Sequence, residues 1–213
     1  MCKICKKNTI NKVINNVDYI FCPSCGFLSK AERHILNSND EFLRYKNHQN
    51  NNEDYKKYQE NFYHIIREFL GENVLDFGCG DGHVLANILA QNGHNSHYYD
   101  LYFYPQENYK KILYDAIILE EVIEHIREPL PVLLPLLSLL KNDGRLIIRT
   151  RFIPSDVFLN NWWYLRDITH ISFFDMKTFK YLCQVLKMQI IYCNDKDIVI
   201  LEKVWWKIDT SYC

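Results

Sequence analysis

The stretch VLDFGCGDG, residues 74–82, decides the fold of this 213-residue chain. An apolar run leads into Asp76, and Gly78, Gly80 and Gly82 then follow at alternate positions before a helical pattern begins. Glycines allow positive φ angles and let the backbone approach a ligand closely, while the first amides of a helix have no partner within it. The stretch therefore predicts a buried strand, a ligand-binding turn and a helix. A tight turn that binds nothing is the plainer alternative.

Short apolar strands alternate with helical patterns around this turn. Strands are expected at residues 73–77, 97–100, 114–119, 145–150, 189–193 and 197–203. Helices are expected at 83–93, at 128–140 and from Asp175 to Leu186, and NDG at 142–144 is expected to form a turn. This alternation with short connections predicts an α/β fold. Its mostly parallel sheet is covered on both faces and ends in an antiparallel pair.

Four of the eight cysteines form two closely spaced pairs, CKIC at Cys2 and Cys5 and CPSC at Cys22 and Cys25. Two such pairs aim four thiolates at one point, which is typical of a tetrahedral zinc site. Four thiolates leave no open position for chemistry, so the zinc is expected to be structural and necessary for so small a segment to fold. Unligated thiols on a disordered arm, or a lost site with only a packing role, are the alternatives.

Charge and hydrophobicity narrow the class of protein. The formal net charge of −1 argues against a main task of gripping nucleic acid, although the basic side chains Lys3, Lys6, Lys7 and Lys12 lie close together in sequence. No apolar run approaches the roughly 18–20 residues that span a bilayer, so no membrane association is expected. The N-terminus lacks the apolar core of a signal peptide, so a cytoplasmic location is expected, where cysteines stay reduced or bind metal.

The spacing D-x-G-x-G-x-G of residues 76–82 resembles motif I of the class I methyltransferases that use S-adenosylmethionine. In that family the loop holds the amino-acid end of the cofactor, and an acid at the end of the second strand binds the ribose hydroxyls. The resemblance implies these cofactor-binding residues: Asp76, Phe77, Gly78, Cys79, Gly80, Gly82, Asp100, Leu101 and Glu121. For Asp100, helix capping is the alternative.

Later strings extend the resemblance. YDAIILEEVIEHIREP (114–129), GRLIIRT (144–150) and DITHISFFDMKTF (167–179) are similar to one large bacterial methyltransferase group. RYKNHQN (44–50), YYDLYF (98–103) and WWYLRDITH (162–170) are similar to a narrower subgroup with an N-terminal zinc ribbon. The implied catalytic residues are Glu121, His125, Asp167 and His170, the last two as an acid–base pair. The implied substrate residues are Tyr45, His48, Tyr164 and Arg166. Helix capping, a buried structural histidine and surface ion pairs are the alternatives for these side chains.

One departure from the family pattern lies after the second strand. Only thirteen residues, 101–113, separate Asp100 from Tyr114, which is too few for a full helix and a third strand. The sheet is therefore expected to be one strand short at this edge. Adenine recognition is then expected to fall to Leu101, Tyr102 and nearby backbone.

Three segments are expected: a zinc ribbon at 1–28, a helical linker or lid at 29–70, and a Rossmann-like methyltransferase domain at 71–213. The expected fold class is a Rossmann-like three-layer α/β sandwich with a C-terminal antiparallel strand and a small N-terminal zinc ribbon. The expected function is in-line methyl transfer from S-adenosylmethionine to a small or carrier-bound metabolite. The alternatives are modification of RNA or protein through the ribbon, and a non-catalytic interaction module.

Overall fold

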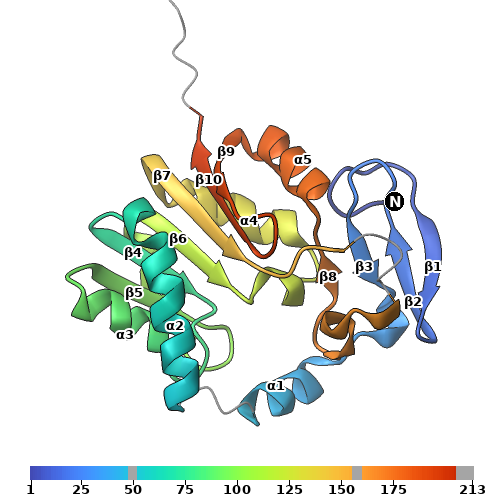
Figure 1. Cartoon of the computed structure of the whole chain (residues 1–213), viewed down its shortest axis with the longest axis horizontal. Coiled ribbons are helices and arrows are strands. Elements are labelled where there is room, and N and C mark those ends of the chain that lie inside the picture. The colour runs from blue at the N-terminus through green and yellow to red at the C-terminus, as the bar shows by residue number, and fades with distance from the viewer. Residues whose placement is uncertain (48–51, 155–159, 205–213) are drawn as a thin grey trace, which may run out of the picture.

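A computed structural model describes residues 1–47, 52–154 and 160–204 of the chain. Its largest element is a six-stranded sheet (Figure 1). In spatial order the strands are β5 (Asn95–Tyr99), β4 (Asn73–Phe77), β6 (Tyr114–Glu120), β7 (Leu140–Arg149), β10 (Ile198–Lys203) and β9 (Met188–Cys193). The first four strands pair in parallel, and β10 is antiparallel to both β7 and β9. This topology confirms the predicted α/β fold with its terminal antiparallel pair.

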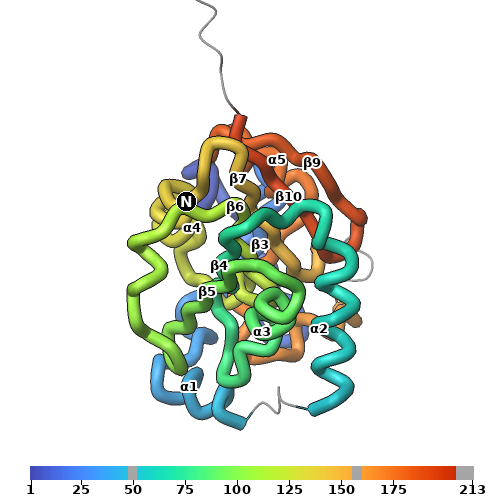
Figure 2. The backbone as a smooth tube through the Cα atoms, turned by 90° about the vertical axis from the view of Figure 1, so that its left-hand side faces the viewer, coloured from blue at the N-terminus to red at the C-terminus, as the bar shows by residue number. Residues whose placement is uncertain are grey.

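Helices cover both faces of this sheet (Figures 1 and 2). Because side chains alternate along a strand, Ala116 and Ile118 face one layer of the core while Ile117 and Leu119 face the other. The first layer is completed by α2 (Glu53–Ile66) and α3 (Val84–Gln91), and the second by α4 (Pro129–Ser138) and α5 (Met176–Leu186). The predicted three-layer sandwich is therefore confirmed. None of the described helices is both long and apolar enough to cross a lipid bilayer.

The prediction that the sheet lacks a strand beyond β5 is also confirmed. Strand β5 has a neighbour on one side only, and among the described residues the connection to β6 contains a short 3-10 helix, Glu107–Lys111, rather than a further strand. Strand β5 begins at Asn95, two residues before the expected start at residue 97, because Asn95 lies in register with Asn73 of β4.

One predicted turn is wrong. Residues 142–144 lie inside β7, which begins at Leu140 immediately after the end of α4. The pairing of β7 with β6 starts at Tyr114, opposite Leu140, and its register shifts before Ala116. The polar residues 142–144 thus form an irregularity within one continuous strand, whereas the sequence pattern indicated a turn between a helix and a strand.

A second sheet contains strands from both ends of the chain. Its order is β1 (Ile10–Ile14), β2 (Val17–Phe21), β3 (Leu28–Lys30) and β8 (Ser172–Phe173). Strand β8 precedes α5 and pairs antiparallel with β3. The Thr178 hydroxyl on α5 also donates to the Cys25 carbonyl oxygen over 2.9 Å. The N-terminal ribbon is therefore built into the second half of the chain and shares a strand with it.

Candidate functional site

A cavity of about 570 Å³ opens at the carboxyl ends of β4, β5 and β6. Its walls come from the glycine-rich turn, from the segments that follow β5 and β6, and from a loop that includes Trp163, Tyr164 and His170. Two helices that precede the sheet in sequence, α1 (Ser38–Lys46) and α2, also contribute residues to the wall. Parallel α/β sheets bind ligands at this edge, so the position and size suit a small-molecule site.

The glycine-rich turn is pinned against the end of β5. Gly78 has φ +88° and Gly80 has φ +67°, which lets the backbone fold back on itself. The amides of Gly78 and Cys79 donate to the Tyr99 carbonyl oxygen over 2.7 and 3.1 Å, and the Gly80 amide donates to Asp100 Oδ2 over 3.0 Å. The turn therefore presents a fixed backbone surface to the cavity, as the sequence pattern indicated.

Asp100 lines the cavity beside this turn. Its Oδ1 accepts hydrogen bonds from the amides of Tyr102 and Phe103 over 2.8 and 3.0 Å. These bonds fix the carboxylate at the end of β5, where Leu101 also lines the cavity. Of the residues expected to bind cofactor, the cavity wall contains Phe77, Gly78, Cys79, Gly80, Asp100, Leu101 and Glu121.

Asp76 and Gly82 do not line the cavity, so the structure does not support the expected direct contact for either residue. The Asp76 side chain is buried at the end of β4, and the Ala86 amide at the start of α3 partly offsets the effect of burial on its pKa. Asp76 therefore faces the start of α3 from behind the turn. Burial raises the pKa of the Asp76 carboxyl to about 7, because charge is disfavoured away from water.

This raised pKa makes a prediction for stability against pH. Well below pH 4, the carboxyl of Asp76 is protonated in the folded and the unfolded chain, so burial of its charge costs nothing. Between about pH 4 and pH 7 only the unfolded chain ionises, and the free energy of unfolding falls as pH rises. Asp76→Asn removes this loss. Relative to wild type, the free energy of unfolding of the variant should rise by up to about 4 kcal/mol between pH 4 and pH 7.5, since a tenfold change in proton affinity corresponds to about 1.4 kcal/mol. Urea unfolding curves that differ by the same amount at every pH would contradict this.

Helices α1 and α2 contribute residues that sequence reasoning missed. Glu41 on α1 accepts hydrogen bonds from the hydroxyls of Tyr45 and Tyr102, over 3.1 and 2.6 Å, and so ties α1 to the segment after β5. Tyr55, Tyr58 and Gln59 on α2 line the opposite wall. Of the residues on α1 and α2, only Tyr45 was expected in the site, and it lies edge-on to the His125 ring. The expected substrate residue His48 lies outside the described residues.

Two glutamates share one tyrosine hydroxyl at the back of the cavity. Tyr164 Oη lies 2.9 Å from Glu121 Oε2 and also contacts Glu124 Oε1 and the Thr150 hydroxyl. Tyr164 has one proton to donate, so it cannot satisfy both carboxyl groups as ionised acceptors. Burial, and next the charge of Glu121, raise the pKa of Glu124 well above its usual range. The Glu124 side chain is fully buried, and among the described residues its Oε2 has no hydrogen-bond partner.

The two expected histidines come together beside this pair. His125 Nδ1 lies 3.1 Å from the Thr169 carbonyl oxygen, and His170 Nδ1 lies 2.9 Å from the Tyr164 carbonyl oxygen. A carbonyl oxygen only accepts, so Nδ1 carries the proton in both rings and the lone pair of each neutral ring lies on Nε2. The ring centroids are 4.8 Å apart. The site thus presents two imidazoles of the same tautomer.

The side chains of Asp167 and His170, expected to form an acid–base pair, show no hydrogen bond to each other among the described residues, and His170 Nδ1 donates to the Tyr164 carbonyl oxygen instead. The Asp167 carboxylate accepts instead from the amide and hydroxyl of Thr169, over 2.9 and 2.7 Å. Burial raises the pKa of Asp167, but these hydrogen bonds outweigh it and lower the pKa to about 2. So acidic a group is a poor general base near neutral pH. Arg166, expected to contact substrate, is exposed and outside the cavity wall.

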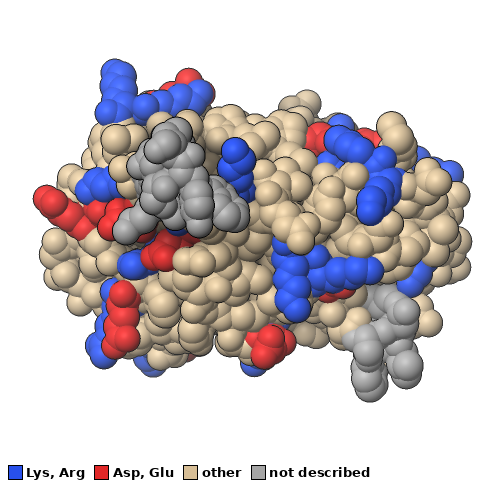
Figure 3. Space-filling model, turned by 90° about the horizontal axis from the view of Figure 1, so that it is seen from above, with Lys and Arg blue, Asp and Glu red and all other residues tan. Residues whose placement is uncertain are grey.

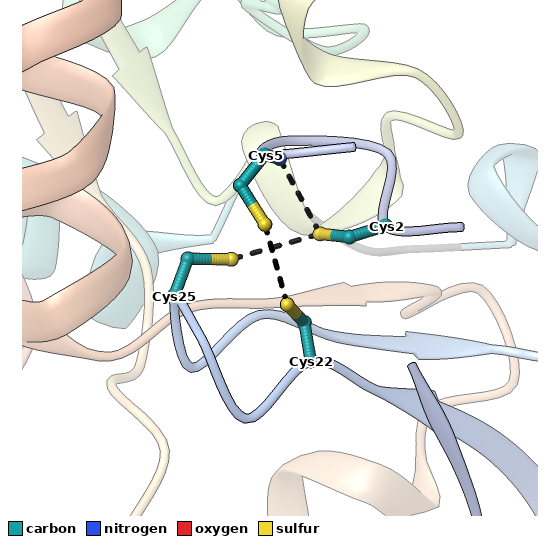
Figure 4. A group of neighbouring side chains, drawn as sticks. All are labelled: Cys2, Cys5, Cys22 and Cys25. Atoms are coloured by element: carbon teal, nitrogen blue, oxygen red, sulfur yellow. Dashed lines mark hydrogen bonds between the residues drawn. The ribbon is translucent and has the colours of Figure 1, made fainter. Parts of the chain in front are cut away.

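The four N-terminal cysteines converge on one point (Figure 4). Cys2 Sγ lies 3.6 Å from Cys25 Sγ, and Cys5 Sγ lies 3.3 Å from Cys22 Sγ. Four sulfurs around one zinc ion, each bonded at about 2.3 Å, lie about 3.8 Å from one another in a tetrahedron. The amides of Ile4 and Cys5 donate to Cys2 Sγ over 3.4 and 3.5 Å, as expected around a thiolate ligand. These buried sulfurs could hold a metal ion without moving far.

The residue that follows each cysteine pair has a left-handed backbone conformation: Lys6 has φ +59° and Gly26 has φ +80°. A Cβ at Gly26 would lie 2.3 Å from Asp175 Oδ2, at the start of α5. We therefore expect Gly26→Ala to lower the free energy of unfolding by about 1–3 kcal/mol, through backbone strain and the clash. Lys6→Gly, which relaxes the equivalent position, should leave stability within about 1 kcal/mol of wild type. Chemical denaturation measures both, and an equal loss in the two variants would contradict the account.

An α/β protein with a glycine-rich turn and a cavity at the carboxyl edge of its sheet belongs to the class that binds nucleotide-like cofactors. Residues 41–186, more than half of the chain, match the family described as methyltransferase domain, and the chain belongs to that family. No curated protein sequence matches the chain.

Solved methyltransferase structures share the fold. A SAM-dependent methyltransferase from Archaeoglobus fulgidus aligns with 18% identity and a TM-score of 0.52 over 70% of this chain and 94% of that one. Magnesium protoporphyrin IX methyltransferase (ChlM) from Synechocystis PCC 6803, solved with bound SAH, aligns with 16% identity and a TM-score of 0.51 over 78% and 94%. The chain spans about half of the mitomycin 7-O-methyltransferase MmcR, with 62% of this chain and 49% of that one aligned at 15% identity and a TM-score of 0.49.

Proposed function

We propose that the chain is an S-adenosylmethionine-dependent methyltransferase whose acceptor is a small molecule, free or attached to a carrier. The observation that carries this proposal is the cavity itself. It joins the pinned glycine-rich turn and Asp100 on one side to Glu121, His125 and Tyr164 on the other. Membership of the methyltransferase domain family supports the reaction class.

The bound cofactor would supply an electrophilic methyl group on a sulfonium cation. In this proposal the backbone of residues 77–80 holds the amino-acid end, and Asp100 accepts hydrogen bonds from the ribose hydroxyls. Leu101 and Tyr102 lie next to Asp100 in the wall, and in this proposal they contact the adenine. The aromatic faces of Tyr45, Tyr58 and Tyr164 can stabilise a cation and exclude water.

We also propose that Cys2, Cys5, Cys22 and Cys25 bind one structural zinc ion. The sulfur spacing supports a closed four-thiolate site, which has no position left for chemistry. The role we assign to zinc is to hold the ribbon that carries β3, and with it the pairing of β3 with β8.

The surface of the ribbon favours a small acceptor over RNA. Lys3 is mostly covered and its Nζ lies 3.2 Å from Glu32 and 3.3 Å from Glu128, while Lys12 lies over the Phe21 ring. Half of the lysine group noted in the sequence is thus engaged with the protein itself. Figure 3 shows basic side chains in small groups on one face, with acidic groups and uncharged surface between them. Phosphate-backbone binding would call for a continuous basic stripe.

Calorimetric titration with S-adenosylhomocysteine (SAH) tests the proposal. We expect saturable binding of one SAH per chain, and an affinity that changes little between about 50 and 200 mM salt. A chain that binds no SAH is not a methyltransferase of this kind, and the interaction-module alternative would then stand. Tight binding of RNA that weakens by orders of magnitude over the same salt range would instead favour a nucleic-acid substrate.

A further inference from the structure

A fully buried carboxyl group lies behind the cavity wall, against Tyr164, and one of its oxygens has no hydrogen-bond partner among the described residues. Glu124 is completely shielded from solvent, its Oε1 contacts the Tyr164 hydroxyl, and its Oε2 contacts no hydrogen-bonding group among the described residues. Buried polar atoms in folded proteins nearly always have a partner, because losing water without replacement is costly. A ligand is therefore expected to complete the bonding of Glu124.

Two imidazoles lie at the same place. One ligand atom from each of Glu124, His125 and His170 can be chosen so that the three lie within 4.8 Å of one another. In both rings the Nδ1–H group donates a hydrogen bond to a backbone carbonyl oxygen, that of Thr169 for His125 and that of Tyr164 for His170. Histidines that bind metals are held in this way, with one nitrogen donating to a carbonyl or carboxylate and the other facing the ion. The tautomers thus place both lone pairs on Nε2, as metal binding needs.

The charges around this point also call for a cation. Glu121 and Glu124 both contact the single hydroxyl of Tyr164, and the described part of the chain places no lysine or arginine in the cavity wall. A divalent ion would balance both carboxylates and would let Glu124 bind in its ionised form. It would also replace the water that the buried oxygen has lost.

We propose that Glu124, His125 and His170 bind a divalent transition-metal cation at the cavity wall, which His125 and His170 line and behind which Glu124 is buried. Imidazole and carboxylate ligands suit Mn²⁺, Fe²⁺, Co²⁺ or Zn²⁺, and three protein ligands leave coordination positions open to a substrate. The N-terminal cysteine site has the opposite character, with four soft thiolates and no open position. The chain would thus hold two metals with different tasks.

The open positions indicate the substrate class, and this step rests on the proposed methyltransferase function. A cation beside the cofactor site lowers the pKa of a hydroxyl group that binds it and orients the oxygen. The hydroxyl proton passes to Glu121, which lines the cavity. The oxygen forms a bond to the methyl carbon as the bond between that carbon and sulfur breaks. The electron pair of the broken bond stays on sulfur, which gives SAH. We therefore expect the acceptor to be a hydroxyl oxygen with a second oxygen near enough to bind the same ion.

Metal binding can be tested without knowing the acceptor. The full chain, with one zinc per chain, is titrated with Mn²⁺ while the electron paramagnetic resonance signal of unbound Mn²⁺ is recorded. Wild type should bind one Mn²⁺ per chain. Glu124→Gln and His170→Asn should each weaken binding at least about tenfold, the latter while keeping a donor for the Tyr164 carbonyl. His64→Ala, at an exposed position on α2, is the matched control and should bind as wild type does.

Titration with Co²⁺ and with SAH separates failure of the metal site from failure of the fold or of the cofactor site. Co²⁺ in the proposed site should give visible absorption without the thiolate charge-transfer bands of a cysteine site. If neither Mn²⁺ nor Co²⁺ binds outside the cysteines, or if the two variants bind as tightly as wild type, the metal site is overturned. SAH titration of the same samples reports the fold and the cofactor site separately. Binding of SAH without binding of Mn²⁺ or Co²⁺ would contradict the metal proposal alone. Binding of the metal ions without binding of SAH would contradict the proposed function alone.

Discussion

Cys22→Ser should leave the ribbon unfolded and the purified chain without its structural zinc. A serine hydroxyl replaces one of four thiolates in a site whose formation contributes about 10–16 kcal/mol to folding in small zinc domains. Weakening that contribution by several kcal/mol is large against the stability of a typical domain, about 5–15 kcal/mol. Loss of the ribbon should also destabilise β8 (Ser172–Phe173), because β3 is the only partner strand of β8 among the described residues.

Hydrogen exchange and zinc content measure this effect. Amides of β3 and β8 should exchange fast in Cys22→Ser, while those of the buried strands β4 and β6 stay protected. Cys193→Ser is the matched control, since Cys193 is partly buried in β9 and does not belong to the group of four cysteines. It should keep one zinc per chain. If Cys22→Ser lost zinc but kept the exchange pattern of wild type, zinc would have no structural role.

Gly78→Ala should weaken SAH binding at least tenfold, which corresponds to about 1.4 kcal/mol. Gly78 has φ +88°, and a Cβ there would lie 2.4 Å from Val122 Cγ2. Val122 lines the cavity after β6, so either the turn or that wall has to move. Movement of the turn displaces the backbone that we propose holds the amino-acid end of the cofactor.

Gly93→Ala separates this effect from simple backbone strain. Gly93 follows α3 and has φ +89°, almost the same as Gly78, but a Cβ there would meet nothing within 4 Å. This variant should lose about 1 kcal/mol of stability and bind SAH as wild type does. Equal SAH affinities for the two variants, measured by calorimetry, would contradict a role for the turn at Gly78 in cofactor binding.

Local patterns predicted the sheet and one wall of the site well. The turn at residues 77–80 follows from glycine spacing alone, and the N-cap at Asp175 follows from a capping box with Thr178, so both lie where expected. The cysteine pairs are equally local. Each of these features depends on residues a few positions apart, which a sequence displays directly.

Features that depend on packing between distant segments were missed. Tyr55, Tyr58 and Phe62 share one face of α2, a spacing that predicts a helix but not which part of that face covers a cavity. The pairing of β3 with Ser172–Phe173 joins segments more than 140 residues apart. The burial of Glu124 against Tyr164 joins side chains 40 residues apart and is visible only in three dimensions.

The most direct measurement is a crystal structure of the zinc-loaded chain with SAH. The account predicts that the amino-acid end lies against residues 77–80, that the ribose hydroxyls face Asp100, and that the sulfur points toward Glu121, His125 and Tyr164. Electron density for SAH elsewhere, or a turn closed against packed side chains with no SAH in the cavity, would contradict it.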